Sequence, residues 1–227
     1  MALLGNAAML LWYDILADEV DAHDAWHTQE HFPERIGIPG FLRAQRWISQ
    51  SGSPRYFVVY EVADIGVLSD APYLQRLNNP TEWTRRMMPA FRGMTRGLCH
   101  VVHRHGMVLG SWALTVRFSF GPGDTRQLAD RLDGTVAALM QRVGLTSAFL
   151  LESGLTPEMT SEQSIRGPDA GVDRVLFLTG YSRQAVDELA VSALSPSTLA
   201  EMGVHPHSKL ELYRLECLAD SRSSPPD

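Results

Sequence analysis

The sequence has 227 residues, of which 44% are hydrophobic and 20% charged, a composition typical of a globular chain that can bury a sizeable core. Its net charge of −6 gives no general attraction to nucleic acid or to an anionic membrane, so we expect neither as a partner. The two cysteines form no C-x-x-C pair, and Asp14 interrupts an apolar N-terminus that has no basic residue before it. These features favour a cytoplasmic protein without a signal peptide, membrane span or disulfide framework.

The first half of the chain predicts the element order β-α-β-β-α-β. In chain order, the expected elements are a strand at 8–16, a helix at 17–32, strands at 41–49 and 55–62, a helical region reaching about 91, and a strand at 93–106. Acidic residues crowd the start of the first helix, as the helix dipole favours. Pro33 should end or kink that helix, and Pro72 and Pro80 should break the later helical region.

The second half repeats this order. Its expected elements are a strand at 111–120, a helix at 125–143, strands at 145–153 and 173–182, a helix at 183–194 extended to about 202, and a strand at 207–218. Asp124 is a candidate N-cap of the first of these helices. The polar loop at 154–172 is the longest segment expected to lack regular structure, and 219–227 is expected to be a disordered tail.

A β-α-β-β-α-β unit of about 100 residues is the ferredoxin-like pattern. We therefore predict an α+β fold of two tandem ferredoxin-like repeats, at 6–106 and 107–218. Each repeat would leave one sheet face bare, so the two repeats would cover each other in an intrachain α/β barrel with helices outside. The repeat is inferred from element order and length. Such a barrel needs no second chain, although a homodimer is compatible with it.

The helix at 17–32 carries the densest chemistry in the sequence. His27-Thr28-Gln29-Glu30-His31 reads H-x-x-E-H, which is also the zinc signature of one class of metalloprotease. A zinc site would need a third, distant ligand such as Glu61 or Glu82, and the motif runs into Pro33 within one turn. We therefore expect no metal at this position.

A helical wheel separates the residues of this helix into two sets. The apolar stripe expected to face the core consists of Ala22, Ala25, Gln29, Phe32, Pro33 and Ile36. The polar shoulder beside it consists of His23, His27, Glu30 and Glu34, with His31 further round. Two interpretations stay open for the shoulder: proton transfer at the mouth of a cleft, or a solvated surface with local His–Glu pairs.

Other candidate site residues lie mostly in the first half, where the aromatic residues gather. Many of these should form the core, but a cleft for a planar ligand would be lined in the same way. The residues that we predict to bind substrate are Trp12, Trp26, Arg46, Trp83 and Met87. Tyr60 is predicted to donate a hydrogen bond to a developing oxyanion. Arg43 and Arg46 on one strand could meet Glu61 on the next.

Trp26, the Glu30-His31 pair and the Pro39-Gly40-Phe41 turn, followed by Arg43 and Arg46, resemble the dimeric α/β-barrel superfamily, in particular its EthD-like branch. The resemblance covers residues 8–62. The second half has neither the E-H pair nor P-G-F, which implies a fused, asymmetric pseudo-dimer with one functional half and one scaffold half.

What the resemblance implies about activity is broad. The superfamily includes cofactor-free monooxygenases, haem-degrading enzymes, chlorite dismutases, lactone isomerases, polyketide cyclases and stress proteins, with ligands in a cleft between the sheet and its helices. Fold alone does not choose among these chemistries.

We predict a small-molecule enzyme without an organic cofactor, acting on a hydrophobic, aromatic or polyketide-like substrate in the first-half cleft. It would be an isomerase, cyclase, dehydratase or cofactor-independent monooxygenase, with His27 or His31 as acid/base and Glu30 orienting it. One alternative is a non-catalytic ligand-binding or stress-related protein. The other is a haem-binding protein, for which His100, His103 and His105 are candidate ligands.

Overall fold

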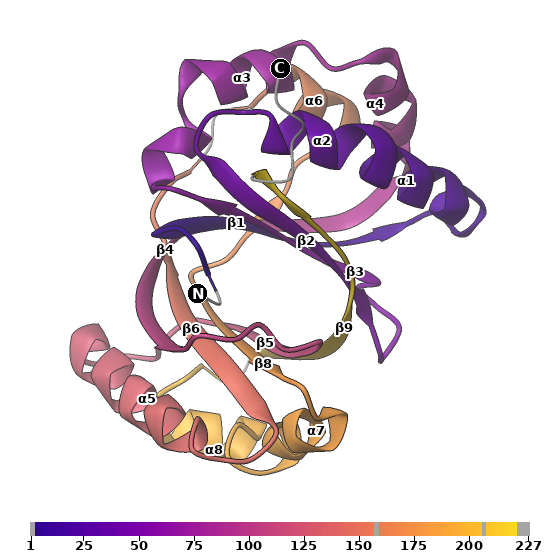
Figure 1. The fold of residues 1–227 in the computed structure, drawn as a ribbon. Coiled ribbons are helices and arrows are strands. Elements are labelled where there is room, and N and C mark those ends of the chain that lie inside the picture. The colour runs from indigo at the N-terminus through magenta and orange to yellow at the C-terminus, as the bar shows by residue number, and fades with distance from the viewer. Residues whose placement is uncertain (1–2, 157–158, 206–207, 222–227) are drawn as a thin grey trace. The chain divides into compact units, whose positions relative to one another are not determined.

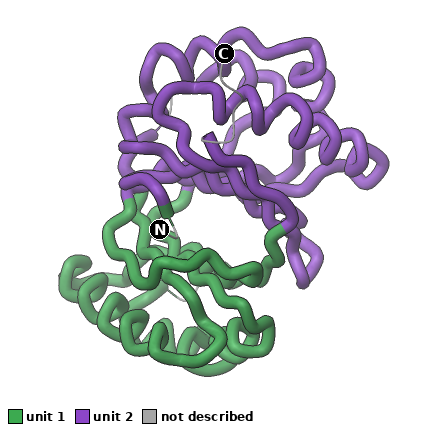
Figure 2. The backbone as a smooth tube through the Cα atoms, viewed as in Figure 1, with its two compact units in different colours: residues 1–3, 101–153, 172–215 green, residues 4–100, 154–171, 216–227 purple. Residues whose placement is uncertain are grey.

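The structure is a computed structural model that describes residues 3–156, 159–205 and 208–221. The chain divides into two compact units that interleave along the sequence (Figure 2). Unit 1 comprises 1–3, 101–153 and 172–215, and unit 2 comprises 4–100, 154–171 and 216–227. The predicted first repeat thus contributes most of unit 2, which also takes in a segment from the second half.

Unit 2 contains a sheet with helices against one of its faces (Figure 1). Its elements are β1 (Ala7–Ile15), a 3-10 turn (Ala17–Glu19), α1 (Val20–Trp26), a π turn (His27–His31), α2 (Phe32–Ile36), β2 (Phe41–Ser49), β3 (Tyr56–Val62), a 3-10 turn (Ile65–Leu68), α3 (Ala71–Asn78), α4 (Glu82–Met87), a 3-10 turn (Met88–Ala90), the first part of β4 (Phe91–Gly106), α6 (Ser161–Arg166) and β7 (Ala170–Gly171). β1 pairs antiparallel with β3 and β4, and β3 pairs antiparallel with β2.

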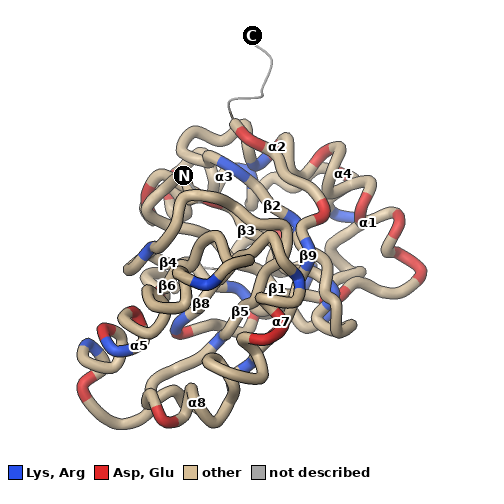
Figure 3. The backbone as a smooth tube through the Cα atoms, turned by 60° about the horizontal axis from the view of Figure 1, so that its bottom comes forward, with Lys and Arg blue, Asp and Glu red and all other residues tan. Residues whose placement is uncertain are grey.

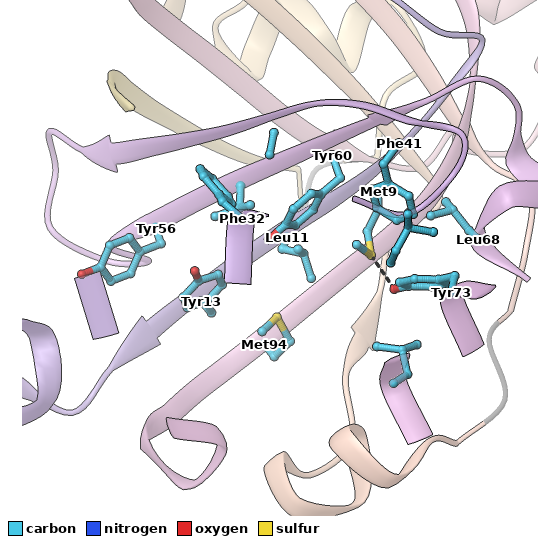
Figure 4. Packing of buried hydrophobic residues seen from close by; sticks show 14 of the residues in the cluster. Met9, Leu11, Tyr13, Phe32, Phe41, Tyr56, Tyr60, Leu68, Tyr73 and Met94 are labelled. Atoms are coloured by element: carbon cyan, nitrogen blue, oxygen red, sulfur yellow. Dashed lines mark hydrogen bonds between the residues drawn. The ribbon is translucent and has the colours of Figure 1, made fainter. Parts of the chain in front are cut away.

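The side chains of β1 alternate between the two faces of this sheet. Met9, Leu11 and Tyr13 join the apolar cluster under the helices, which also holds Trp26 of α1. Trp12 points to the opposite face, where its ring stacks on Phe57 at a centroid distance of 4.9 Å. The helix-side face of β1 therefore supplies the floor of any cleft in this unit (Figure 4).

Unit 1 repeats the arrangement with its own apolar cluster. Its elements are β5 (Trp112–Phe118), α5 (Thr125–Leu139), β6 (Leu145–Ser153), β8 (Arg174–Gly180), α7 (Arg183–Val191), α8 (Pro196–Glu201) and most of β9 (Lys209–Asp220). β8 pairs antiparallel with β5 and β6, and β5 pairs antiparallel with β9. Asp124 caps α5 as predicted, because its side chain accepts from the backbone N–H groups of Arg126 and Gln127.

The hydrogen-bonded strand order is β4-β1-β3-β2 in unit 2 and β9-β5-β8-β6 in unit 1. It is the order expected from two ferredoxin-like repeats, so the predicted α+β fold is confirmed. No helix among the described residues is long and apolar enough to cross a membrane.

Two predictions about irregular segments were wrong. The 154–172 loop contains the helix α6, whose N-cap Thr160 accepts a hydrogen bond from the Gln163 backbone N–H. Six residues are too few to show helical periodicity, and buried ion pairs hold the segment instead. The expected disordered tail starts too early, since β9 continues to Asp220; residues 222–227 of that tail lie outside the described residues.

The predicted buried face of the first helix was also wrong. Ala22 and Gln29 are exposed, whereas His23 and His27 are buried together with Trp26. The cause is the π turn at His27–His31, which holds one residue more than an α-helical turn and so rotates everything after it by about 100°. A helical wheel drawn at a constant 100° per residue leaves this extra residue out. It correctly placed Phe32 and Ile36 on the buried face, but it put the wrong residues before the turn on the same face.

Candidate functional site

A small pocket, here called the inner pocket, lies in unit 2 between the helix side of the sheet and the helices. Its volume is about 40 Å³, enough for a few water-sized groups. The apolar part of its lining consists of Met9, Leu11, Trp26, Leu77, Met88, Phe91 and Met94. The polar part consists of Tyr13, His27, His31, Arg35, Tyr60, Tyr73, Arg96, Glu162 and Arg166. Figure 4 shows how Tyr13, Tyr60 and Tyr73 lie around this space.

Three histidines form a row along α1 and the π turn. The rings of His23 and His27 are 5.2 Å apart between centroids, and those of His27 and His31 are 5.4 Å apart, with interplanar angles of 20° and 26°. Because residues four apart lie on the same face of a helix, the three rings stack along it. Two members of this row, His27 and His31, line the inner pocket.

All three histidines have pKa values below the usual range for the residue. Burial is the largest cause in each case, and it lowers the pKa of His27 and His31 strongly. The positive charges of Arg46 and Arg35 act in the same direction on the pKa of His27. Near neutral pH, His27 and His31 are therefore uncharged, and each ring offers one N–H donor and one lone pair.

The neighbours of His27 fix which of its nitrogens carries the proton. Nδ1 lies 3.4 Å from Nη1 of Arg46, and a guanidinium can only donate, so Nδ1 is the acceptor. Nε2 must then carry the hydrogen and donate to the Tyr60 hydroxyl, 3.4 Å away. His27 therefore acts as a hydrogen-bond donor to Tyr60. Its lone pair is taken up by Arg46, so His27 does not act as a base.

His31 has a different environment. Its Nδ1 atom is buried and has no hydrogen-bond partner among the described residues. The ring packs on Trp26 at a centroid distance of 4.4 Å, which holds it in place. Both predicted acid/base residues line the pocket, and His31 is the one with a nitrogen that no described residue engages.

Glu30 does not orient either histidine in the way we predicted from the sequence. Its Oε1 atom accepts from the Trp26 indole at 3.2 Å, from the Thr81 hydroxyl at 2.6 Å and from the Thr84 hydroxyl at 3.3 Å. Glu30 therefore holds Trp26, and through it the wall against which His31 packs.

A hydrogen-bonded chain leads away from the pocket through His23. The Asp24 carboxylate lies 3.0 Å from Nδ1 of His23, so this nitrogen donates, and Nε2 accepts from the Tyr13 hydroxyl at 3.1 Å. Tyr13 lines the pocket, and the Asp24 side chain is 26% exposed. The chain Tyr13–His23–Asp24 therefore joins the pocket to solvent.

The remaining wall is charged and comes from both halves of the sequence. Arg35 of α2 donates to Glu34 and to both carboxylate oxygens of Glu162. Arg96 of β4 and Arg166 of α6 share Asp169. Burial lowers the pKa of Arg35, but the neighbouring carboxylates of Glu162 and Glu34 raise it by more, so Arg35 stays charged.

Other predicted site residues lie outside the lining of the inner pocket. Trp12 is on the opposite sheet face, Trp83 is partly buried at the edge of the core, and Met87 belongs to the core, whereas the adjacent Met88 lines the pocket. Arg46 lies behind His27 and binds Glu216 through its Nε atom at 2.6 Å. The predicted meeting with Glu61 holds for Arg43 but not for Arg46, which is on the other face of β2.

Several lining residues were not identified from the sequence: Tyr13, Arg35, Arg96, Glu162 and Arg166. The i, i+4 spacing of His23 and His27 was visible in the sequence, but we placed these histidines beside the buried face of the helix and not on it. A signal for α6 was also present, because Thr160-x-x-Gln163 fits the capping-box pattern.

A larger cavity, here called the outer pocket, adjoins the inner one. It measures about 300 Å³ and shares Tyr73, Leu77 and Arg96 with the inner pocket. The rest of its lining consists of Leu68, Ser69, Leu74, Leu98, Leu155, Thr156 and Thr160. Together the two form a polar end and an apolar body, the usual character of a small-molecule site.

No group of three or more metal-ligating side chains occurs in the part of the chain that the structure describes. Glu61, one third ligand considered for the H-x-x-E-H zinc site, instead pairs with Arg43, at 2.6 Å. Two of the three histidines of β4 are also engaged, since His103 and His105 both contact Asp133.

The sequence matches no family model, and a comparison with curated proteins gives no match. Solved structures are similar over nearly the whole chain. An anthrone oxidase-like protein has a TM-score of 0.69 at 11% identity, covering 97% of this chain and 96% of its own. A candidate monooxygenase from Fusobacterium nucleatum subsp. nucleatum has a TM-score of 0.62 at 8% identity, covering 96% of both chains.

A candidate chlorite dismutase is also similar, with a TM-score of 0.57 at 10% identity, covering 93% of this chain and 94% of its own. At these identities the likeness concerns the fold. The chain therefore has the dimeric α/β-barrel fold that the first-half motifs predicted.

Proposed function

We propose that this chain is a cofactor-independent oxygenase that removes an acidic proton from a hydrophobic, ring-bearing small molecule whose reacting end enters the inner pocket. The observation that carries the proposal is the unpaired Nδ1 atom of the neutral His31, which lines the inner pocket together with the His27–Tyr60 donor pair. Two of the similar structures are described by their names as monooxygenase or anthrone oxidase-like, which supports oxygen chemistry over isomerisation, cyclisation or dehydration.

In the first step, His31 takes the acidic proton of the substrate as general base. The Tyr60 hydroxyl, which accepts from His27, donates to the oxygen on which negative charge develops. Burial raises the pKa of Tyr60, so the hydroxyl stays protonated and remains a donor. The product of this step is a resonance-stabilised carbanion or enolate.

In the second step, the carbanion reacts with molecular oxygen, and its electrons are the only reductant needed. For a CH₂ group flanked by aromatic rings, one C–O bond forms and two C–H bonds break. One oxygen atom becomes the carbonyl of the product, and the other leaves as water with the two hydrogens. The balance is therefore substrate plus O₂ to ketone plus H₂O.

His31 would return its proton to the departing oxygen, and the Tyr13–His23–Asp24 chain would exchange protons between the pocket and solvent without net release. Tyr13→Phe breaks the chain at its pocket end, and Asp24→Asn weakens its exposed end. Both variants should slow turnover and alter its pH dependence, while Glu30→Gln should have a smaller effect because its amide oxygen can still accept from Trp26.

The test measures oxygen uptake with anthrone as substrate, against an enzyme-free blank. We expect oxygen and anthrone to be consumed in equal amounts, with a kcat at least about 100-fold lower for His31→Ala. His103→Ala, at a partly exposed histidine outside the pocket, is the matched control and should match the wild type. Absence of uptake would leave the non-catalytic binding protein as the better description, and unchanged turnover in His31→Ala would remove His31 as the general base.

The residues of the inner pocket do not fit haem. A volume of about 40 Å³ admits no porphyrin, and both nitrogens of His27 have protein partners. No step is therefore assigned to haem, and a Soret band after addition of haem to the purified protein would contradict this conclusion. The EthD-like branch and a cytoplasmic location are proposed on the sequence alone.

A further inference from the structure

Arg166 brings an unused donor to the inner pocket. Its Nη2 atom binds both carboxylate oxygens of Asp169, at 2.7 and 2.9 Å, and its guanidinium lies 6.0 Å from the centre of the Phe91 ring. Its Nε atom is buried and has no hydrogen-bond partner among the described residues. A buried, unpaired donor on a side chain that is only 10% exposed points to a ligand atom that accepts from it.

His31 lines the same pocket, and its buried Nδ1 atom likewise has no hydrogen-bond partner among the described residues. A guanidinium N–H can only donate, whereas a neutral imidazole nitrogen without hydrogen accepts. The group that satisfies both is a hydroxyl, because its oxygen accepts from Arg166 while its hydrogen is donated to His31. A carbonyl or an ether oxygen would satisfy only the arginine.

The charges around this pair indicate a neutral head group. Arg35, Arg96 and Arg166 contribute three positive charges, and Glu34, Glu162 and Asp169, which bind them, contribute three negative ones. A carboxylate or phosphate would bring a charge that nothing in this set balances. A neutral hydroxyl that loses its proton to His31 keeps the total charge of the site unchanged.

The body of the ligand is indicated by the outer pocket. Five of its lining residues are leucines, and Tyr73, Leu77 and Arg96 connect it to the inner pocket. Its volume of about 300 Å³ lies at the lower end of the range for small-molecule sites, which suits a fused-ring system.

We propose that Arg166 and His31 together bind the hydroxyl of a neutral phenol or enol whose rings occupy the outer pocket. This inference rests on the proposed function and deepens it, because the substrate then binds as its enol or phenol tautomer, and removal of the hydroxyl proton by His31 gives the same enolate as removal of a C–H proton from the ketone. The Nε–H group of Arg166 stabilises the resulting oxyanion. Helix α6, expected from the sequence to be an unstructured loop, thereby becomes part of the substrate site.

The test measures binding of three related probes by titration calorimetry: 1-naphthol, 1-methoxynaphthalene and naphthalene. The hydroxyl probe can engage both atoms, the ether only Arg166, and the hydrocarbon neither. We expect the wild type to bind 1-naphthol about tenfold or more tightly than naphthalene, with the ether between them. Arg166→Lys keeps the charge beside Asp169 but removes the Nε–H group, and should abolish most of this preference.

Arg174→Lys is the matched control, since Arg174 is an equally buried, ion-paired arginine outside both pockets. It should bind all three probes as the wild type does. If Arg166→Lys does not fold, the wild-type protein labelled with ¹⁵N gives a second measurement. One arginine Nε–H resonance should shift on addition of 1-naphthol but not of naphthalene.

Equal affinity for 1-naphthol and naphthalene, or an unchanged preference in Arg166→Lys, would overturn the inference. These binding results are independent of turnover. Hydroxyl-selective binding without oxygen uptake would reject the proposed oxygenase and keep the head-group site. Oxygen uptake together with probe binding that does not depend on Arg166 would keep the proposed oxygenase and reject the head-group site.

Discussion

Glu162 and Arg35 form a buried ion pair across 127 residues of sequence, with Nη2 of Arg35 lying 2.9 Å from both carboxylate oxygens. Their side chains are 5% and 2% exposed. Helix α6 is therefore fixed to α2 by a contact that excludes water. A buried ion pair adds little stability compared with an apolar pair of similar size. The loss of one partner, however, leaves an uncompensated buried charge and destabilises the protein.

Glu162→Ala should destabilise the protein strongly, because it leaves the charge of Arg35 buried with only Glu34 to balance it. We expect a loss of about 3–5 kcal/mol in the free energy of unfolding, measured by urea denaturation. Glu152→Ala is the control: Glu152 also pairs with an arginine, but it is 46% exposed, and its loss should cost at most about 1 kcal/mol. Equal effects of the two substitutions would contradict the anchoring role of Glu162.

The protonation state of His27 is a second prediction. Since Arg46 occupies Nδ1, long-range ¹H–¹⁵N spectra at neutral pH should show the tautomer with hydrogen on Nε2. Arg46→Met removes that constraint and should produce a mixture of tautomers. A Nδ1–H tautomer in the wild type would mean that His27, and not His31, offers its lone pair to the pocket.

The stability of the protein should fall as the pH drops below about 6.5. The pKa values of His23, His27 and His31 are lowered by folding, so below the pKa of the unfolded chain these residues bind protons in the unfolded state first. Their contribution is complete above about pH 6.5 and is lost towards lower pH, by up to about 1.4 kcal/mol per pH unit for each histidine.

Urea denaturation at pH 7.5, 6.0 and 5.0 measures this slope. His27→Gln cannot take up the proton and should flatten it. A free energy of unfolding that stays constant between pH 7.5 and 5.0 would show that the three histidines are not held neutral by burial.

The Pro39-Gly40-Phe41 turn gives a fourth prediction. Gly40 has a φ of +91°, and a Cβ atom there would lie 2.5 Å from Cγ2 of Val67. Gly40→Ala should therefore cost more than backbone strain alone, about 1–3 kcal/mol for the strain plus the clash. Gly52→Ala is the matched control, because Gly52 has a φ of +110° and nothing within 4 Å of a Cβ atom. Thermal unfolding of the two variants should separate them clearly, and equal shifts would mean that Val67 moves aside.

The fold was predictable because its signals are local and repeated. Alternating strands, helices with capping residues and the order of elements in each half led to the observed topology, and the cap at Asp124 was confirmed. The motif H-x-x-E-H lies on the helix that lines the inner pocket, through His27 and His31.

The details of the site depend on features with no local signal. A π turn adds one residue to a helix without any characteristic sequence, and this error in phase placed the histidines on the wrong side. Arg35 is held by Glu162, which is 127 residues away in the sequence, and Arg166 lies on a six-residue helix. A shift of one residue in a strand also moves every side chain to the other face of the sheet. Trp12 and Tyr13 are neighbours in the sequence and lie on opposite faces for this reason.

The π turn at His27–His31 also suggests how such a site could arise in one genetic event. Insertion of a single codon into an uninterrupted helix would have rotated the following residues by about 100°, and buried residues now lie on both sides of the turn, His23 and His27 before it and Arg35 and Ile36 after it. The histidine row would have stayed in place while Arg35 turned toward the position that Glu162 now occupies.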